Sequence, residues 1–414
     1  MTPSSLRALH SMSRYSSSVA KWEAALPVPE DAHLKGHHVK GQDGKTIGFR
    51  NPHPSAGAWQ DFSTPQVLFE ALRGRLRGKL ILADPSKARI PTVRPAFPAR
   101  DGPVTTIRAT WLGHACYFVE MPSGATVLFD PVFEDRCSPS QWMGPKRFTA
   151  PACKPADLPT VDAVIISHSH FDHLSETSVR DITSTHPRAQ FFVGLGLGAL
   201  FKGLGINRVT EMDWWEDATL ELVREGPPIS TTAEVVGENK ARTSQKITAR
   251  VSCLPSQHAS GRGILDKDRT LWASWAVASG GKSVWFGGDT GYRAVPELPE
   301  GVDDYGPDYE GLPRCPQFAQ IGRLRGPFDL GLIPIGAYKP RYMYSGWHAN
   351  PYDSVEIFRD TACKRAMGIH WGTWALTAED VEEPPKMLRE ALQKAGIDAT
   401  GIFDVCPIGE SREF

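Results

Sequence analysis

Residues 167–173 of the chain read SHSHFDH, and this stretch decides how the rest is interpreted. It overlaps the end of an apolar run at 161–167 that predicts a short buried strand. His168, His170 and His173 supply imidazoles, which suit zinc, and Asp172 supplies a carboxylate for a second divalent ion. Ionisable groups at the end of a buried strand cost free energy unless something compensates them, so the stretch predicts a metal site.

Four later residues are candidates for the remaining ligands. His258 follows an alternating run that predicts a strand, and Asp289 follows a β-rich run that ends in two glycines, which permit close backbone approach. His370 ends another apolar run, and His348 lies in a loop. Taken singly each is ambiguous. Together with the cluster they complete two ligand sets, and the residues alone leave His348 and His370 as alternatives.

Two other polar residues near these elements have a different interpretation. We expect His114 and Asp130 to position the ligands or fix loops, because metal-bound histidines need such partners.

The pattern of runs predicts the fold class. Strands first pair as meanders and later alternate with helices, which predicts two sheets with helices outside, an α/β protein. The expected strands are 105–111, 115–121, 126–129, 161–167, 190–193, 246–254, 271–278, 283–286, 330–334 and 366–370. The expected helices are 175–184, 351–364 and 384–395.

The rest of the chain divides into three parts. Residues 1–30 are either a mitochondrial targeting segment or a disordered tail, because the first 22 are rich in serine and arginine and have no acidic residue. We expect residues 31–103 to form an extension that wraps the core, and residues 104–414 to form the catalytic domain.

Three shorter segments have distinct patterns. Residues 65–78 predict an amphipathic helix, either docked on the protein or lying at a membrane surface. Residues 221–245 and 300–325 are weakly patterned and are expected to be loop insertions.

Composition narrows the class of protein. The net charge is −1, from 46 basic and 47 acidic residues, without a basic stripe, so we expect no nucleic-acid partner. No apolar run approaches the roughly 20 residues that span a bilayer. The seven widely spaced cysteines contain no CxxC pair and predict reduced thiols in an intracellular compartment.

The order of these motifs resembles a known family. His168-x-His170-x-Asp172-His173, followed by His258 and Asp289, is similar to the metallo-β-lactamase superfamily over residues 104–414. The resemblance implies an αβ/βα sandwich with two zinc ions at one edge. Six further segments look like N-acylphosphatidylethanolamine-hydrolysing phospholipase D of a fungal type, namely 141–148, 255–258, 287–292, 333–338, 369–373 and 409–412.

The resemblance also implies roles for residues. It assigns His168, His170 and His258 to the first zinc, Asp172, His173 and His348 to the second, and Asp289 to the position between them. It leaves His370 near the site, with Asp172, Asp289 and His370 as the catalytic residues. Gln141 and Trp142 are expected to line the lipid entrance.

The function that follows is a zinc-dependent phosphodiesterase. It would hydrolyse N-acylphosphatidylethanolamine at a membrane surface to N-acylethanolamine and phosphatidic acid. We expect a peripheral, intracellular enzyme that is mitochondrial if residues 1–30 are a targeting segment, and the resemblance implies that a homodimer can form. Two alternatives stay open. One is another hydrolase of this fold, such as a lactonase or a soluble phosphodiesterase, and the other is a non-catalytic binding protein with a degenerate site.

Overall fold

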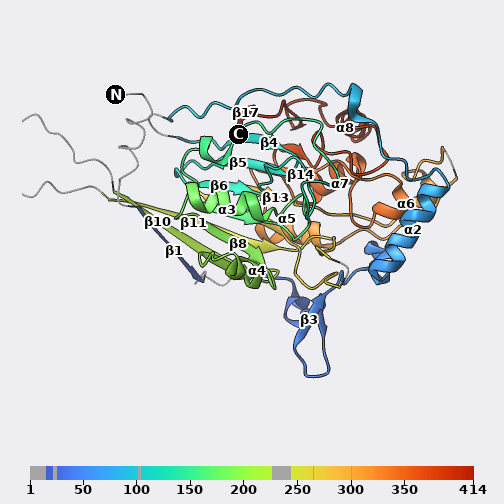
Figure 1. Ribbon diagram of the computed structural model, residues 1–414, viewed down its shortest axis with the longest axis horizontal. Coiled ribbons are helices and arrows are strands. Elements are labelled where there is room, and N and C mark those ends of the chain that lie inside the picture. The colour runs from blue at the N-terminus through green and yellow to red at the C-terminus, as the bar shows by residue number, and fades with distance from the viewer. Residues whose placement is uncertain (1–14, 22–25, 101–103, 226–243, 264, 300) are drawn as a thin grey trace, which may run out of the picture.

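The computed structural model describes residues 15–21, 26–100, 104–225, 244–263, 265–299 and 301–414. Two mixed β-sheets pack against each other and helices cover their outer faces (Figure 1). The predicted αβ/βα sandwich is therefore confirmed. Within the described residues, no helix combines the length and the apolar character that a membrane span requires.

The first sheet has seven strands in the order β17-β4-β5-β6-β7-β8-β9. Its strands pair antiparallel from β17 to β6 and parallel from β6 to β9. They are β4 (Arg108–Gly113), β5 (Cys116–Glu120), β6 (Thr126–Phe129), β7 (Ala163–Ile166), β8 (Gln190–Gly194), β9 (Val209–Met212) and β17 (Ser411–Glu413).

The second sheet has eight strands in the order β1-β10-β11-β12-β13-β14-β15-β16. It is antiparallel as far as β13 and parallel from β13 to β16. The strands are β1 (Tyr15–Lys21), β10 (Asp217–Glu225), β11 (Ser244–Leu254), β12 (Ser274–Ser279), β13 (Lys282–Phe286), β14 (Leu330–Pro334), β15 (Ala366–Ile369) and β16 (Phe403–Asp404).

Alternation along the strands builds two apolar layers. Tyr117 and Ile165 belong to the core between the sheets, whereas their neighbours Phe118 and Val164 belong to the layer under helix α3. All four side chains are at most 1% exposed. Full burial of each such side chain contributes about 1.5–3 kcal/mol, so this layering defines the register of the strands.

The helices divide between the two sheets. Buried residues of α3 and α4 join the layer outside the seven-stranded sheet, and those of α5, α7 and α8 pack with the eight-stranded one. The described α-helices of residues 104–414 are α3 (Glu176–Thr185), α4 (Gly198–Gly203), α5 (Gln317–Arg325), α6 (Arg341–Tyr344), α7 (Pro351–Asp360) and α8 (Glu383–Lys394). Single 3-10 turns occur at Pro155–Asp157 and Pro307–Tyr309.

The N-terminal extension consists of short elements. It contains a hairpin of β2 (His38–Lys40) and β3 (Thr46–Phe49), then α2 (Thr64–Leu76), which confirms the predicted helix. Ser63 and Gln66 form a capping box at the start of α2. Its 3-10 turns are Glu30–Leu34, Pro54–Ala56, Ala58–Asp61 and Pro85–Lys87.

Several elements differ from the sequence-based expectation, and three of these differences concern segments that were expected to be a tail or insertions. Residues 15–21, expected in a tail or targeting segment, form edge strand β1, which pairs with β10. The first expected insertion begins inside strand β10, and its residues 226–243 lie outside the described residues. The second contains helix α5, whose Phe318 and Ile321 are fully buried.

Candidate metal centre

The candidate centre lies where strands of both sheets end. His168 follows β7, His258 follows β11, Asp289 follows β13 and His370 follows β15. The close approach of the 167–173 loop to the end of β13 depends on Gly288. Its φ is +58°, and a Cβ atom there would lie 2.6 Å from Cβ of Ser167.

One carboxylate oxygen stands at the middle of the cluster. Five imidazoles surround Oδ2 of Asp289, whose side chain is only 1% exposed. The nitrogen distances are 3.0 Å for His370, 3.1 Å for His173, 3.6 Å for His258, 3.9 Å for His168 and 3.9 Å for His348. The predicted convergence of residues from distant parts of the chain is what the structure shows.

The first group contains three imidazoles. Nδ1 of His170 lies 2.8 Å from Nε2 of His168 and 3.2 Å from Nε2 of His258. The other ring nitrogens of His168 and His258 contact neighbouring groups that fix the two rings. Nδ1 of His168 lies 2.9 Å from Oγ of Ser167, and Nδ1 of His258 lies 2.8 Å from the carbonyl oxygen of Trp347. Burial holds the pKa of His168 and of His258 well below the ordinary value, so both are neutral, the form that binds a metal.

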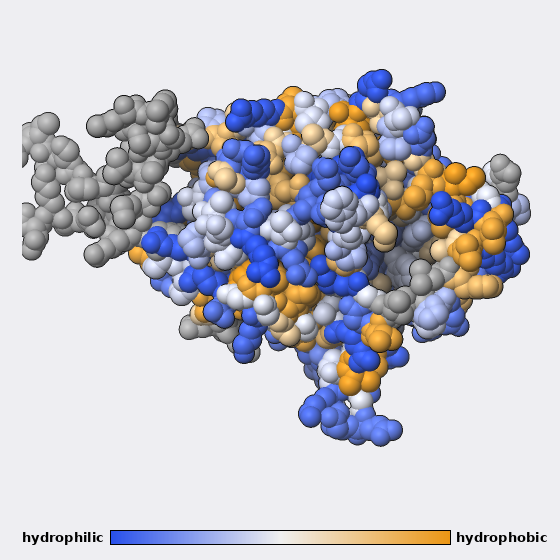
Figure 2. All heavy atoms as spheres, viewed as in Figure 1, coloured by the Kyte–Doolittle hydropathy of each residue, from blue (hydrophilic) through white to orange (hydrophobic). Residues whose placement is uncertain are grey.

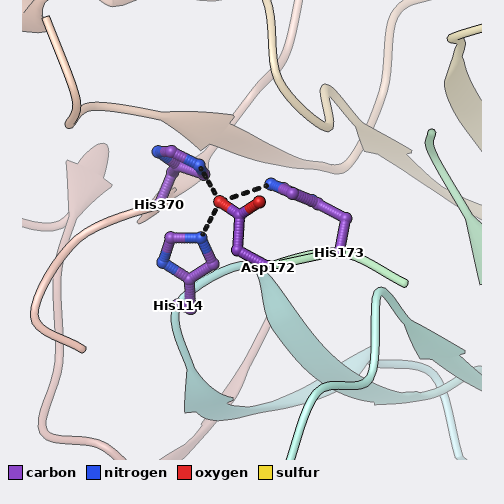
Figure 3. A group of neighbouring side chains, drawn as sticks. All are labelled: His114, Asp172, His173 and His370. Carbon is purple, nitrogen blue, oxygen red and sulfur yellow. Dashed lines mark hydrogen bonds and ion pairs between the residues drawn. The ribbon is translucent and has the colours of Figure 1, made fainter. Parts of the chain in front are cut away.

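The second group surrounds Asp172 (Figure 3). Its Oδ2 lies 3.0 Å from Nε2 of His114, 3.3 Å from Nε2 of His370 and 3.5 Å from Nε2 of His173. Burial lowers the pKa of His370, but the carboxylates of Asp289 and Asp172 outweigh it and raise that pKa to about 9. Burial also lowers the pKa of His114, to about 3.

The position of His348 differs from the expected one. The resemblance grouped it with Asp172 and His173, but the structure groups it with His258 and Asp289. His370 instead lies beside Asp172 and His173, because it directly follows a strand that runs parallel to β14. The geometry therefore favours His370 over His348 as the last member of the second ligand set, and the ligand roles themselves stay predictions.

The residues present fit a pair of metal ions. Nε2 of His173 and Oδ1 of Asp289 are buried without a hydrogen-bond partner, and Nε2 of His173 lies 3.1 Å from Oδ2 of Asp289. Ring nitrogens that face one another at 2.8 and 3.2 Å make a poor hydrogen-bond network but a suitable set of zinc ligands.

Asp130 supports the centre as predicted. Its Oδ2 accepts hydrogen bonds from Nδ1 of His173 at 2.6 Å and from Oγ of Ser167 at 2.5 Å. Asp130, His114 and His370 all have positive φ, at 37°, 52° and 63°. Such conformations are uncommon without glycine and cluster at functional sites, where the surrounding structure enforces them.

The two expected entrance residues lie on a surface loop. Oε1 of Gln141 accepts a hydrogen bond from the backbone N–H of Arg136, and its Nε2 donates to the carbonyl of the same residue. The side chain of Trp142 is 91% exposed. These contacts give Gln141 a role in shaping the loop, and the substrate role of both residues stays a prediction.

Sequence reasoning missed one contact that fixes His258. Nδ2 of Asn51, in the N-terminal extension, donates to the carbonyl of His258 at 2.8 Å, and its Oδ1 accepts from the N–H of His258 at 3.2 Å. No local pattern in the sequence indicates this contact, because Asn51 and His258 are 207 positions apart.

The fold and the centre together define a metal-dependent hydrolase of the β-lactamase type. The model of the beta-lactamase superfamily domain matches residues 125–371. An N-acyl-phosphatidylethanolamine-hydrolyzing phospholipase D of Caenorhabditis elegans is 36% identical over 290 residues, which is 69% of each chain. The chain belongs to this phospholipase D family within the superfamily, which confirms the resemblance seen in the sequence.

Two other relatives extend the comparison. An uncharacterized protein of Mycobacterium tuberculosis is 32% identical over 364 residues, 84% of this chain and 82% of that protein. The mitochondrial N-acyl-phosphatidylethanolamine-hydrolyzing phospholipase D of Saccharomyces cerevisiae is 28% identical over 309 residues, 74% of this chain and 56% of that protein.

Asp130 allows a direct test of the support around His173. We expect Asp130→Asn to lower metal affinity about 10- to 100-fold, because the uncharged amide orients the imidazole less strongly. Competition with a chelator, followed by measurement of bound metal, gives the affinity. Asp329→Asn is a matched control, since Asp329 is also buried but lies at the start of β14. Equal affinities of both variants would contradict the role of Asp130.

Proposed function

We propose that the chain is a zinc-dependent phospholipase D. It hydrolyses N-acylphosphatidylethanolamine to N-acylethanolamine and phosphatidic acid, with two zinc ions as cofactors. The observation that carries the proposal is the placement of five imidazoles around Oδ2 of Asp289, with Asp172 beside them. The substrate class is supported by the similarity to the relative from Caenorhabditis elegans.

The two ligand sets, together with Asp289, would hold the ions. His168, His170 and His258 form one set, and Asp172, His173 and His370 the other, with His114 beside Asp172. Zinc held there would lower the pKa of bound water to about 7 and would bring positive charge close to the phosphate oxygens.

The chain's own residues then position the substrate. The side chains of Asp172 and His348 are each 15% exposed, whereas that of Asp289 is 1% exposed, so substrate approaches past the first two. Asp172 orients water by accepting its hydrogen bond. The P–O bond to the N-acylethanolamine oxygen breaks, water supplies the hydroxyl that joins phosphorus, and the leaving alcohol receives the proton.

The reaction itself is tested by identifying its products. We expect N-acylphosphatidylethanolamine in vesicles, in heavy-oxygen water, to give N-acylethanolamine and labelled phosphatidic acid, because attack occurs at phosphorus. A chelator should abolish the reaction and added zinc should restore it. Mass spectrometry identifies the products. Release of free fatty acid, or turnover of soluble lactones or phosphodiesters alone, would contradict the proposal and favour another hydrolase of this fold.

Helix α2 is our candidate for contact with the membrane. Phe69, Leu72 and Leu76 are 63%, 56% and 81% exposed, and Arg73 and Arg75 lie among them. Figure 2 shows apolar side chains gathered over α2, beside a hollow in this face of the molecule. An exposed apolar stripe with adjacent cations fits the surface of an anionic bilayer.

The membrane role is tested with a double variant. We expect Leu72→Gln with Leu76→Gln to weaken binding to anionic vesicles about 100-fold, because each buried leucine contributes about 1.5 kcal/mol or more. Vesicle sedimentation measures the binding. Ile47→Gln is the control, since Ile47 is 46% exposed but lies on the β2–β3 hairpin. Unchanged vesicle binding of the double variant would support a helix that serves only to cover the protein.

We also propose that the protein acts as a peripheral protein of mitochondria. The support is the basic, serine-rich start of the chain and the mitochondrial relative from yeast. Residues 1–14 of that segment lie outside the described residues. A homodimer stays a prediction from the family.

A further inference from the structure

A second cluster of metal-type ligands lies away from the centre. His37 and His38 stand at the start of the β2–β3 hairpin, which projects from the lower side of the molecule in Figure 1, and Asp213 lies between β9 and β10. Nε2 of His37 lies 2.7 Å from Oδ1 of Asp213, and Nε2 of His38 lies 2.9 Å from Oδ2. The three ligand atoms lie within 4.8 Å of one another.

Neighbouring groups fix the orientation of these ligands. The ring of Trp214 stacks on His37 with 4.1 Å between the centroids, and the backbone N–H of Trp214 donates to Oδ1 of Asp213 at 2.8 Å. Oγ1 of Thr46 lies 2.9 Å from Nδ1 of His38. Contacts of this kind hold an imidazole so that its other nitrogen points at a metal.

Charge and burial also suit a cation. The side chains of His37, His38 and Asp213 are 7%, 9% and 6% exposed. Burial holds the pKa of His38 below its ordinary value, although Asp213 acts in the opposite direction. Two imidazoles and one carboxylate are a nitrogen and oxygen set that zinc accepts.

Lys35 supplies a cation at the same carboxylate. Its Nζ lies 2.9 Å from Oδ2 of Asp213, and its side chain is 36% exposed, so it has room to turn toward solvent. We propose that His37, His38 and Asp213 bind a divalent ion of the zinc class, with water in the fourth position, and that Lys35 competes with this ion for Asp213.

This site would fasten the extension to the catalytic domain. It joins residues 176 positions apart, and an ion that closes so long a loop removes much conformational freedom from the unfolded chain. The fastened segment continues to Asn51, whose amide holds both backbone groups of His258. The ion therefore has a structural role, and its loss loosens one side of the catalytic centre.

The test counts zinc ions in the full-length chain. Wild type, His38→Gln and His33→Gln are equilibrated in a zinc buffer and their zinc content is measured by elemental mass spectrometry. We expect His38→Gln to hold one zinc per chain fewer than wild type. His33→Gln should be unchanged, because His33 is exposed in the same extension and lies outside the cluster. Repeating the comparison in an Asp289→Asn chain separates this ion from those of the centre.

A second variant acts in the opposite direction. Lys35→Met removes the competing ammonium, and we expect it to bind this zinc about tenfold more tightly, since one nearby positive charge is lost. This gain does not depend on the folding of His38→Gln. Equal zinc content in wild type and His38→Gln, or unchanged zinc affinity in Lys35→Met, would overturn the proposal. The cluster would then be a hydrogen-bonded contact between the extension and Asp213 that binds no metal.

Discussion

Asp289→Asn is expected to lower turnover of N-acylphosphatidylethanolamine by more than about 100-fold, with loss of bound metal at the same time. Substitution of a residue that only orients a metal ligand already lowers metal affinity or activity about 10- to 100-fold. Asp289 lies within 4 Å of five imidazoles, so we expect a larger effect. The substitution keeps the volume of the side chain but removes its negative charge. Imidazoles of both ligand sets would then lose the carboxylate they share.

Metal content and kinetics of the same preparation test this expectation. Bound zinc is measured by elemental mass spectrometry, and turnover by release of N-acylethanolamine. Asp329→Asn is again the matched control, because its carboxylate pairs with Lys282 and Lys364 at the start of β14. An Asp289→Asn variant that is active and fully loaded with zinc would refute the centre as we describe it.

His370→Gln is expected to have the second largest effect, and His348→Gln is its natural comparison. Nε2 of His370 lies 3.0 Å from Asp289 and 3.3 Å from Asp172, and its side chain is fully buried. Nδ1 of His348 lies 3.9 Å from Asp289, on the more exposed side of the centre. We therefore expect His370→Gln to lose about one zinc per chain and more than about 100-fold in turnover.

His348→Gln should keep its zinc and lose activity through weaker substrate positioning. Zinc content separates the two variants independently of the assay, and circular dichroism checks that both are folded. The opposite result, with zinc lost from His348→Gln and kept by His370→Gln, would restore the assignment suggested by the family resemblance.

Much of the fold was predictable because its strands carry strong local patterns. Residues 163–166, just before His168, are all apolar and form the fully buried strand β7. Strand β1 was missed because YSSSVAK has few apolar residues, as suits an edge strand with one neighbour. Helix α5 was missed because its short pattern buries only one stripe against α7.

The sequence by itself determined the chemistry of this protein. Three imidazoles and a carboxylate within six residues after a buried strand leave few uses other than binding metal, because burial without compensation would be costly. The tertiary structure alone decided whether His348 or His370 joins Asp172 and His173. His348 and His370 are both histidines near a predicted element, and only the parallel pairing of β14 with β15 puts His370 at the edge where Asp172 and His173 lie.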